Sequence, residues 1–146
     1  AVLLLLAGIG ILAQMQRAPA NVAMLRQFAA GDQFAGYHPA WRSFFNASDW
    51  IAENTRESAV VTVRKPRLFY LWTGRQVREY PFSTDTDSVL SVVLETDYVL
   101  IDQISGTTGR YLVPAVQSAG TRFRVSHQTS APQNFVLEVV PEEPGG

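Results

Sequence analysis

Three basic side chains surround a proline in the segment VVTVRKPRLFYLWTGR, residues 60–75, and their types and spacing are those best suited to chemistry in this chain. Arg64, Lys65 and Arg67 follow a β-branched run, and Pro66 stands where the first turn of a helix accepts proline. The free N–H groups and the dipole at a helix start favour anions. The segment therefore predicts a contact with an anion or a lipid headgroup.

The same segment also has a structural interpretation. It lacks a glycine-rich loop that could wrap a phosphate, and Pro66 removes one backbone donor. In this interpretation the cations form a solvated rim that pairs with nearby carboxylates such as Glu57 and Glu79. Both interpretations stay open at the level of sequence. The candidate anion or partner contacts are Arg64, Lys65, Arg67 and Arg75.

Other residue types give little support for catalysis or metal binding. The chain has no cysteine, and His38 and His127 each lack a second ligand at helical spacing, whereas zinc needs at least three converging ligands. No serine lies in a G-x-S-x-G elbow. Asp102 is the best-placed carboxylate, because it ends a predicted strand and open α/β sheets bind ligands there. We expect no catalytic residue, no metal and no cofactor in this chain.

Aromatic side chains gather in two places. They are Trp41, Phe44, Phe45 and Trp50 in the first, and Phe69, Tyr70 and Trp72 in the second. Their helical spacing predicts that most of them pack in a core. We expect Tyr70 and Trp72 to mark one exposed patch that faces the membrane or a partner.

The first thirteen residues, AVLLLLAGIGILA, carry no charge and no strongly polar side chain. As a helix they would reach roughly 20 Å, which is short of the about 30 Å of a bilayer core. We interpret residues 1–16 as the end of a transmembrane helix that begins upstream and contacts membrane lipid; a signal-peptide remnant and a buried helix are the alternatives. Residues 17–37 are expected to form an amphipathic juxtamembrane segment, in which Pro19 should break or restart the helix.

Residues 38–140 alternate between helix and strand patterns. Helices are predicted at 38–55, 66–74, 89–94 and 106–119, and strands at 59–63, 76–80, 98–102, 123–127 and 135–140. This alternation predicts a small three-layer α/β domain with a mixed sheet, whose last two strands form an antiparallel hairpin. The polar tail, residues 141–146, is expected to be flexible.

Composition limits the class of partner. The 146 residues are 47% hydrophobic, which is enough for one globular core. A formal net charge of -1, from 12 basic and 13 acidic residues, provides no overall basic field. No nucleic-acid partner is therefore expected.

The run from WIAENT through AVVTVRKPRLFYLWTGRQVREYP to DYVLIDQ resembles a known type of domain. It is similar to the soluble domain after the last transmembrane helix of bacterial polytopic glycosyltransferases, those like dolichyl-phosphate-mannose mannosyltransferases and lipid A aminoarabinose transferases. The resemblance spans residues 41–103. The matching positions are Trp50, Ile51, Asn54, Thr55, Arg64, Lys65, Pro66, Thr73, Gly74 and Arg75.

This resemblance implies an α/β fold and an extracytoplasmic location. In such transferases the catalytic carboxylates and the polyprenyl-phosphate sugar site belong to a multi-span membrane region that this sequence does not contain. No catalytic residue is therefore carried over to this chain.

Two functions are consistent with these features. In the first, the chain is a non-catalytic α/β domain anchored in the bacterial inner membrane and exposed to the periplasm. It would act as an accessory or structural subunit beside protein partners in an envelope, respiratory or photosynthetic complex. In the alternative, it is a C-terminal periplasmic fragment of a glycosyltransferase that uses a polyprenyl-phosphate sugar donor.

Overall fold

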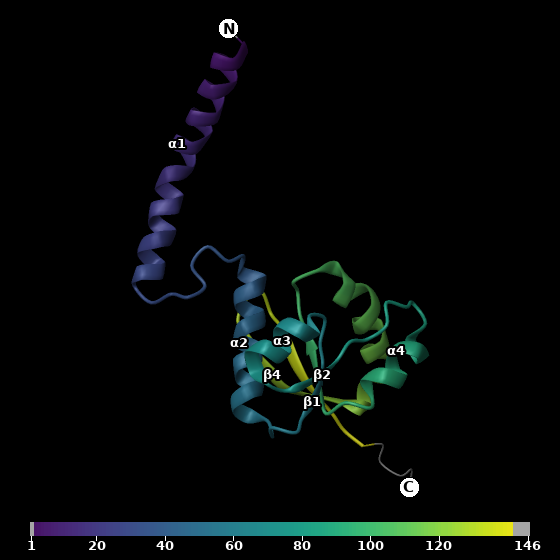
Figure 1. The fold of residues 1–146 in the computed structure, drawn as a ribbon. Coiled ribbons are helices and arrows are strands. Elements are labelled where there is room, and N and C mark those ends of the chain that lie inside the picture. The colour runs from purple at the N-terminus through teal and green to yellow at the C-terminus, as the bar shows by residue number, and fades with distance from the viewer. Residues whose placement is uncertain (1, 142–146) are drawn as a thin grey trace. The chain divides into compact units, whose positions relative to one another are not determined.

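The computed structural model of the chain describes residues 2–141, with side chains described from residue 15 onward. Two compact units follow one another along the chain, Ala1–His38 and Pro39–Gly146. Figure 1 shows the first unit in purple to blue and the second in blue through teal and green to yellow.

The first unit is a single helix, α1 (Val2–Ala29), followed by a turn. The expectation that Pro19 breaks or restarts the helix is wrong, since Pro19 lies inside α1. A proline removes only one backbone donor, and its neighbours Ala18 and Ala20 are strong helix formers, so the helix continues through it. The turn begins at Gly31, whose φ of 97° lies in the left-handed region open to glycine.

The apolar segment expected to be the end of a transmembrane helix, residues 1–16, falls almost entirely on side chains outside the described residues. Within the described part of the chain, no helix combines the length and the apolar character needed to cross a membrane.

The second unit is built on a five-stranded mixed sheet. Its strands are β1 (Val60–Thr62), β2 (Gln76–Arg78), β3 (Tyr98–Ile101), β4 (Phe123–Gln128) and β5 (Phe135–Val139), and their order across the sheet is β2-β1-β3-β5-β4. Strand β1 pairs in parallel with β2 and β3. The predicted C-terminal hairpin of β4 and β5 is confirmed as antiparallel, and β5 also pairs antiparallel with β3.

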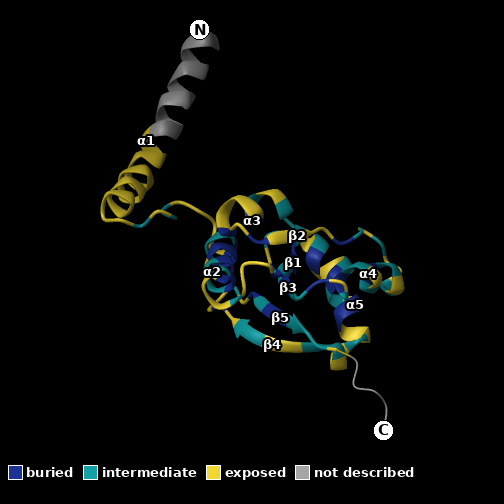
Figure 2. Cartoon of the chain, turned by 60° about the horizontal axis from the view of Figure 1, so that its bottom comes forward, coloured by how far each residue is buried: buried dark blue, intermediate teal, exposed yellow. Residues whose placement is uncertain are grey.

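Helices cover both faces of this sheet (Figure 2). On one side, α4 (Thr86–Val93) and α5 (Val113–Ser118) pack on Val99 of β3 and Leu137 of β5, which are directly paired. The next cross-strand pair, Leu100 with Val136, is also buried, and side chains alternate between the faces of a strand. The α/β prediction is confirmed, with one mixed sheet between helices.

The opposite face carries α2 (Pro39–Asn54) and α3 (Pro66–Thr73). The ring of Phe44 lies 6.4 Å from that of Phe69, and the ring of Phe45 lies 4.6 Å from that of Trp72. Helix α2 also contacts β4 and β5. The predicted core-facing aromatic cluster of α2 is therefore confirmed, and it fastens α3 to the sheet.

The boundaries of α3 follow the sequence signals. Pro66 occupies the start of the helix, and Gly74 ends it in a left-handed conformation with φ of 69°, where its N–H donates to the carbonyl of Tyr70. Helix α4 begins differently, with a side-chain cap: the Asp85 carboxylate accepts a hydrogen bond from the Asp87 N–H.

The predicted helix at 106–119 is less regular than expected. Residues Thr108–Leu112 form a π-helical segment, η1, before α5, and a short 3₁₀ turn, η2 (Gly120–Arg122), leads into β4. Pro114 lies in the first turn of α5 and cannot donate a backbone hydrogen bond, which favours a wider turn before it.

Candidate functional site

Polar side chains collect where the three parallel strands end. Arg64 follows β1, Glu79 and Tyr80 follow β2, and Asp102 follows β3. Because β1 runs parallel to both β2 and β3, these ends lie along one edge of the sheet, the edge at which open α/β sheets bind ligands. Together with Thr107 and Thr108 they are here named the carboxyl-end cluster.

Arg64 is the central member of the carboxyl-end cluster. Its Nε donates to the Thr107 hydroxyl at 2.9 Å, and its Nη1 donates to a Glu79 carboxylate oxygen at 2.9 Å. The guanidinium also lies 4.3 Å from the centre of the Phe82 ring, a cation–π distance. The pairing with Glu79 expected in the structural interpretation is present, so Arg64 is committed to contacts within the domain.

Asp102 is almost completely buried, with 2% of its surface exposed. One carboxylate oxygen, Oδ1, accepts a hydrogen bond of 3.0 Å from the Ile104 N–H. Desolvation by burial raises the pKa of the Asp102 carboxyl, and the Ile104 N–H, the Thr108 hydroxyl and the Arg64 charge offset part of that rise. The other oxygen, Oδ2, has no partner of hydrogen-bond geometry among the described residues.

Tyr80 completes the buried side of the carboxyl-end cluster. Its hydroxyl lies 3.2 Å from that of Thr108, and the residue is buried in the core beside α4 and α5. Burial raises the pKa of the Tyr80 phenol above its ordinary value, and the Asp102 carboxylate adds to that effect. Tyr80 is thus a hydroxyl held in its neutral form, suited to hydrogen bonding and not to nucleophilic attack.

The other predicted contact residues lie in different surroundings. Arg75 is buried and donates to the backbone oxygens of Ala52 at 2.6 Å and Thr55 at 2.9 Å, where it closes the end of α2. Lys65 is half-buried at the residue before α3, and Arg67 is exposed on α3. The structure therefore does not bring the four predicted cations together into one basic site.

The predicted aromatic patch on α3 is exposed. Tyr70 is 54% exposed and Trp72 is 39% exposed, and Leu71 between them is 81% exposed. The indole N–H of Trp72 donates to Asp49 at 2.6 Å, which fixes the ring on α2. These three residues, Tyr70, Leu71 and Trp72, are here named the α3 face. The sequence analysis indicated the two aromatic members, Tyr70 and Trp72, and did not single out Leu71.

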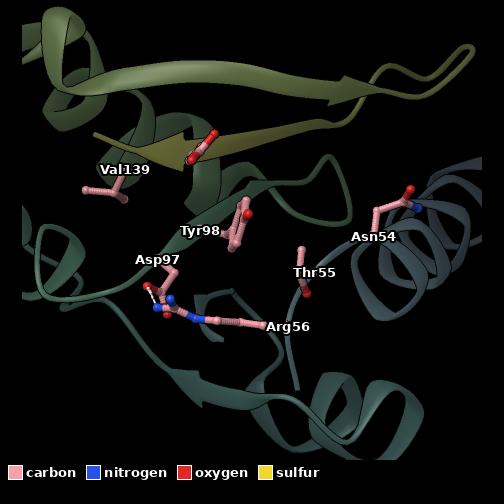
Figure 3. Close-up of a pocket in the computed structure, with 7 residues that line it drawn as sticks. Asn54, Thr55, Arg56, Asp97, Tyr98 and Val139 are labelled. Atoms are coloured by element: carbon pink, nitrogen blue, oxygen red, sulfur yellow. Dashed lines mark hydrogen bonds and ion pairs between the residues drawn. The ribbon is translucent and has the colours of Figure 1, made fainter. Parts of the chain in front are cut away.

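A cavity lies beside the start of β3, at the end of the parallel strands opposite to the carboxyl-end cluster (Figure 3). It measures about 230 Å³, and its charged members are paired, with Arg56 bound to Asp97. The other Asp97 oxygen accepts the Val60 N–H at 2.8 Å. Burial raises the pKa of the Tyr98 phenol, with contributions from Glu138 and Asp97. The contacts of Asp97 with Arg56 and Val60 fix the register of β1 and β3, so the Asp97 carboxylate has a structural role.

No three His, Cys, Asp or Glu side chains within the described residues are placed to hold a metal ion together. Sequence reasoning identified Asp102 but missed Tyr80, Thr107 and Thr108, because their partners lie far away along the chain. The Ser-Gly-Thr-Thr-Gly run at 105–109, a polar loop directly after a strand, was the signal that could have indicated them.

Comparisons with models of known protein families, with curated proteins and with solved structures give no match for this chain.

Proposed function

We propose that this chain is a membrane-anchored, non-catalytic extracytoplasmic α/β domain that serves as an accessory or structural subunit of a larger membrane-protein assembly in the bacterial inner membrane. The membrane anchor rests on the apolar run at residues 1–13. The subunit role rests on one structural observation, the α3 face.

The α3 face has the composition of a protein contact. Leu71 exposes 81% of its surface and Tyr70 exposes 54%, on a helix whose other side packs through Phe69 into the core. Exposed apolar area gains about 25 cal/mol per Å² when a partner removes it from water. Aromatic residues are enriched at the centres of interfaces. Because Trp72 is fixed by Asp49, the face is already ordered before a partner arrives, which lowers the entropic cost of binding.

The charges near the α3 face support the same function. Arg64 donates hydrogen bonds to Thr107 and Glu79. Arg75 donates to the end of α2, so both arginines are engaged within the domain. Arg67 remains exposed on α3 itself. An interface with an apolar centre and a basic rim suits a membrane-protein partner with an acidic rim on its extracytoplasmic side.

Copurification after mild detergent extraction tests this proposal. Leu71→Glu places a charge at the centre of the α3 face and should remove an integral membrane partner that copurifies with the parent chain. Val125→Glu is the matched control. Val125 is also exposed, at 57%, but it lies on β4, the outer strand of the sheet on the side away from β1 and β2. If the parent chain always purifies alone, or if both variants keep the partner, the subunit role is wrong.

A second candidate is the C-terminal periplasmic domain of a lipid-linked sugar glycosyltransferase, and a specific observation favours it. Residues that carry the resemblance form one structural unit: Pro66 starts α3, Gly74 ends it, and Arg75 fastens it to α2. In this candidate the α3 face contacts the membrane region of the same polypeptide. The coding sequence upstream of Ala1 distinguishes the two, since many further hydrophobic spans support the transferase and one span supports the subunit.

A further inference from the structure

An apolar stripe runs along the second half of α1, where the side chains are described. Between residues 15 and 29, apolar side chains recur at alternating spacings of three and four residues. This is the pattern of the a and d positions of a coiled coil, which recur about every 3.5 residues. The residues of this pattern are here named the α1 seam: Met15, Ala18, Val22, Leu25 and Ala29.

The polar side chains of the same stretch all lie outside the α1 seam. They are Gln16, Arg17, Asn21, Arg26 and Gln27. At about 100° of rotation per residue, Gln16 and Gln27 lie on the opposite side of the helix. Pro19 falls at an e position, so the residue without a backbone donor lies beside the seam and not in it. The stretch therefore has one apolar side and one polar side.

The α1 seam is left exposed by the rest of the first unit. Met15 is 67% exposed and Leu25 is 61% exposed. The turn after α1 lies against another side of the helix, where Gly36 meets the side chain of Met24. A helix on its own is marginally stable in water, and most helices gain their stability by packing an apolar side against another element. The seam is therefore available to an element outside this unit.

The residue types of the α1 seam favour a second copy of the same helix. A β-branched residue at a with leucine at d, as in Val22 and Leu25, favours two helices in parallel. The small side chains of Ala18 and Ala29 let two backbones approach closely. The membrane anchor proposed above also gives every copy the same direction, as a parallel pair needs.

The charges of α1 are compatible with such self-pairing. Arg17 and Arg26 are its only charged side chains. Arg17 is at a c position, away from the contact. In a parallel pair a g residue lies opposite the e residue five positions later in the other helix, so Arg26 of one copy lies opposite Asn21 of the other. The Asn21 amide oxygen can accept a hydrogen bond from a guanidinium, and no like charges meet.

We propose that α1 pairs in parallel with α1 of a second copy of this chain, as a two-stranded coiled coil packed through the α1 seam. This contact uses neither the α3 face nor the carboxyl-end cluster. It goes beyond the proposed function because it assigns a second interaction surface, one that joins two copies of the chain to each other.

Disulfide formation between single cysteines tests the contact, because the chain has no cysteine of its own. Equal a or d positions face each other across a parallel pair, within reach of a disulfide. In membranes from cells that express the full chain, mild oxidation should therefore link Val22→Cys into dimers, and likewise Leu25→Cys. Ala20→Cys is the matched control, since Ala20 is exposed on the opposite side of the same helix, and it should stay monomeric.

A charge within the α1 seam should separate the two copies. Val22→Glu, added to the Leu25→Cys chain, should abolish the linked dimer, because it places two carboxylates at the centre of the contact. Glutamate is a better helix former than valine, so this loss would not come from unfolding of α1. Ala20→Glu is the control and should leave the dimer unchanged. Leu71→Glu should also leave it unchanged, so this test and the copurification test can fail separately.

Three results would overturn the proposal. The first is that the seam cysteines stay monomeric or link no faster than Ala20→Cys, as expected if the seam packs on the chain's own second unit. The second is that mass spectrometry finds the seam cysteines joined to a different protein, which would assign the seam to a partner helix. The third is that Val22→Glu leaves the linked dimer intact.

Discussion

The guanidinium of Arg75 donates a hydrogen bond of 2.6 Å to the backbone oxygen of Ala52, and so the residue before β2 closes the end of α2. A second bond, 2.9 Å long, reaches the backbone oxygen of Thr55. The last carbonyl groups of a helix have no partner within the helix, and a cation placed there also interacts favourably with the helix dipole. Arg75 therefore joins α2, α3 and β2 in one unit.

Replacing Arg75 should destabilise the domain strongly. Arg75→Ala is expected to lower the free energy of unfolding by about 3 kcal/mol, because charged hydrogen bonds to two partly buried carbonyls are lost. Chemical denaturation of the solubilised chain measures this change. The control is Arg67→Ala, an exposed arginine of α3, which should change the same quantity by less than about 0.5 kcal/mol. Equal effects of the two substitutions would show that Arg75 does not hold α2.

Arg64 should stabilise the carboxyl edge of the sheet more than its ion pair alone suggests. Arg64→Ala removes the bonds to Thr107 and Glu79 and the contact with Phe82, and we expect a loss of about 2 kcal/mol. Glu79 is 45% exposed, so a double-mutant cycle between Arg64 and Glu79 should give a coupling of only about 0.5–1 kcal/mol. A coupling as large as the whole Arg64 effect would contradict this assignment.

Asp102 should make the stability of the domain fall as the pH rises. Burial raises the pKa of its carboxyl above the ordinary value of 3.8, so the folded state holds the proton more tightly than the unfolded state. This contribution to stability is full below the unfolded pKa and is lost as the pH rises through the folded pKa. Asp102→Asn cannot titrate there, so its stability relative to the parent chain should increase as the pH rises from below the ordinary value of 3.8 through the raised pKa of the folded carboxyl.

Carboxyl carbon chemical shifts of Asp102 measure the same property directly. They should report a midpoint above the ordinary value. A midpoint at or below the ordinary value, together with a pH-independent difference between Asp102→Asn and the parent chain, would show that the carboxyl is solvated or paired.

Asn134 should be replaceable by an apolar residue of similar shape. Its side chain is fully buried, and neither its amide nitrogen nor its amide oxygen has a hydrogen-bond partner among the described residues. Asn134→Leu is expected to leave the free energy of unfolding unchanged or raise it by up to about 2 kcal/mol, because two unsatisfied polar groups disappear.

Thr129 supplies the contrast for that prediction. Its hydroxyl accepts the Asn134 N–H at 2.9 Å and lies 2.6 Å from the Ser43 hydroxyl, so Thr129→Val should lower the free energy of unfolding by about 1–3 kcal/mol. Chemical denaturation of both variants measures these changes in the free energy of unfolding. Loss of stability in Asn134→Leu as large as in Thr129→Val would mean that the amide has a partner, such as a buried water.

Local patterns in the sequence were sufficient to predict most of the fold. The i, i+3, i+4 spacing of Trp41, Phe44 and Phe45 gave the core-facing side of α2, and Pro66 and Gly74 gave the two ends of α3. These features depend on backbone preferences and on burial over a few residues. They are readable without knowledge of the rest of the chain.

The features that could not be predicted depend on residues distant in sequence. Arg64 donates a hydrogen bond to Thr107, which lies 43 residues later in the chain. The Trp50 ring stacks on the His127 ring, with 4.8 Å between the ring centres. The insertion of β5 between β3 and β4 decides which strands are neighbours, and a hairpin pattern is compatible with either order. The hydrogen-bond partners of Arg64 and Arg75 could not be predicted for the same reason, because they come from other elements.

Photo-crosslinking in intact membranes tests most directly whether the α3 face contacts a membrane partner. A photoreactive phenylalanine analogue at position 71 should give a crosslink to an integral membrane protein, or to the membrane region of the same polypeptide, identified by mass spectrometry. The same analogue at position 125, an exposed control site on β4, should give no such product. Crosslinks absent at position 71, or equally strong at both positions, would contradict a specific contact through the α3 face.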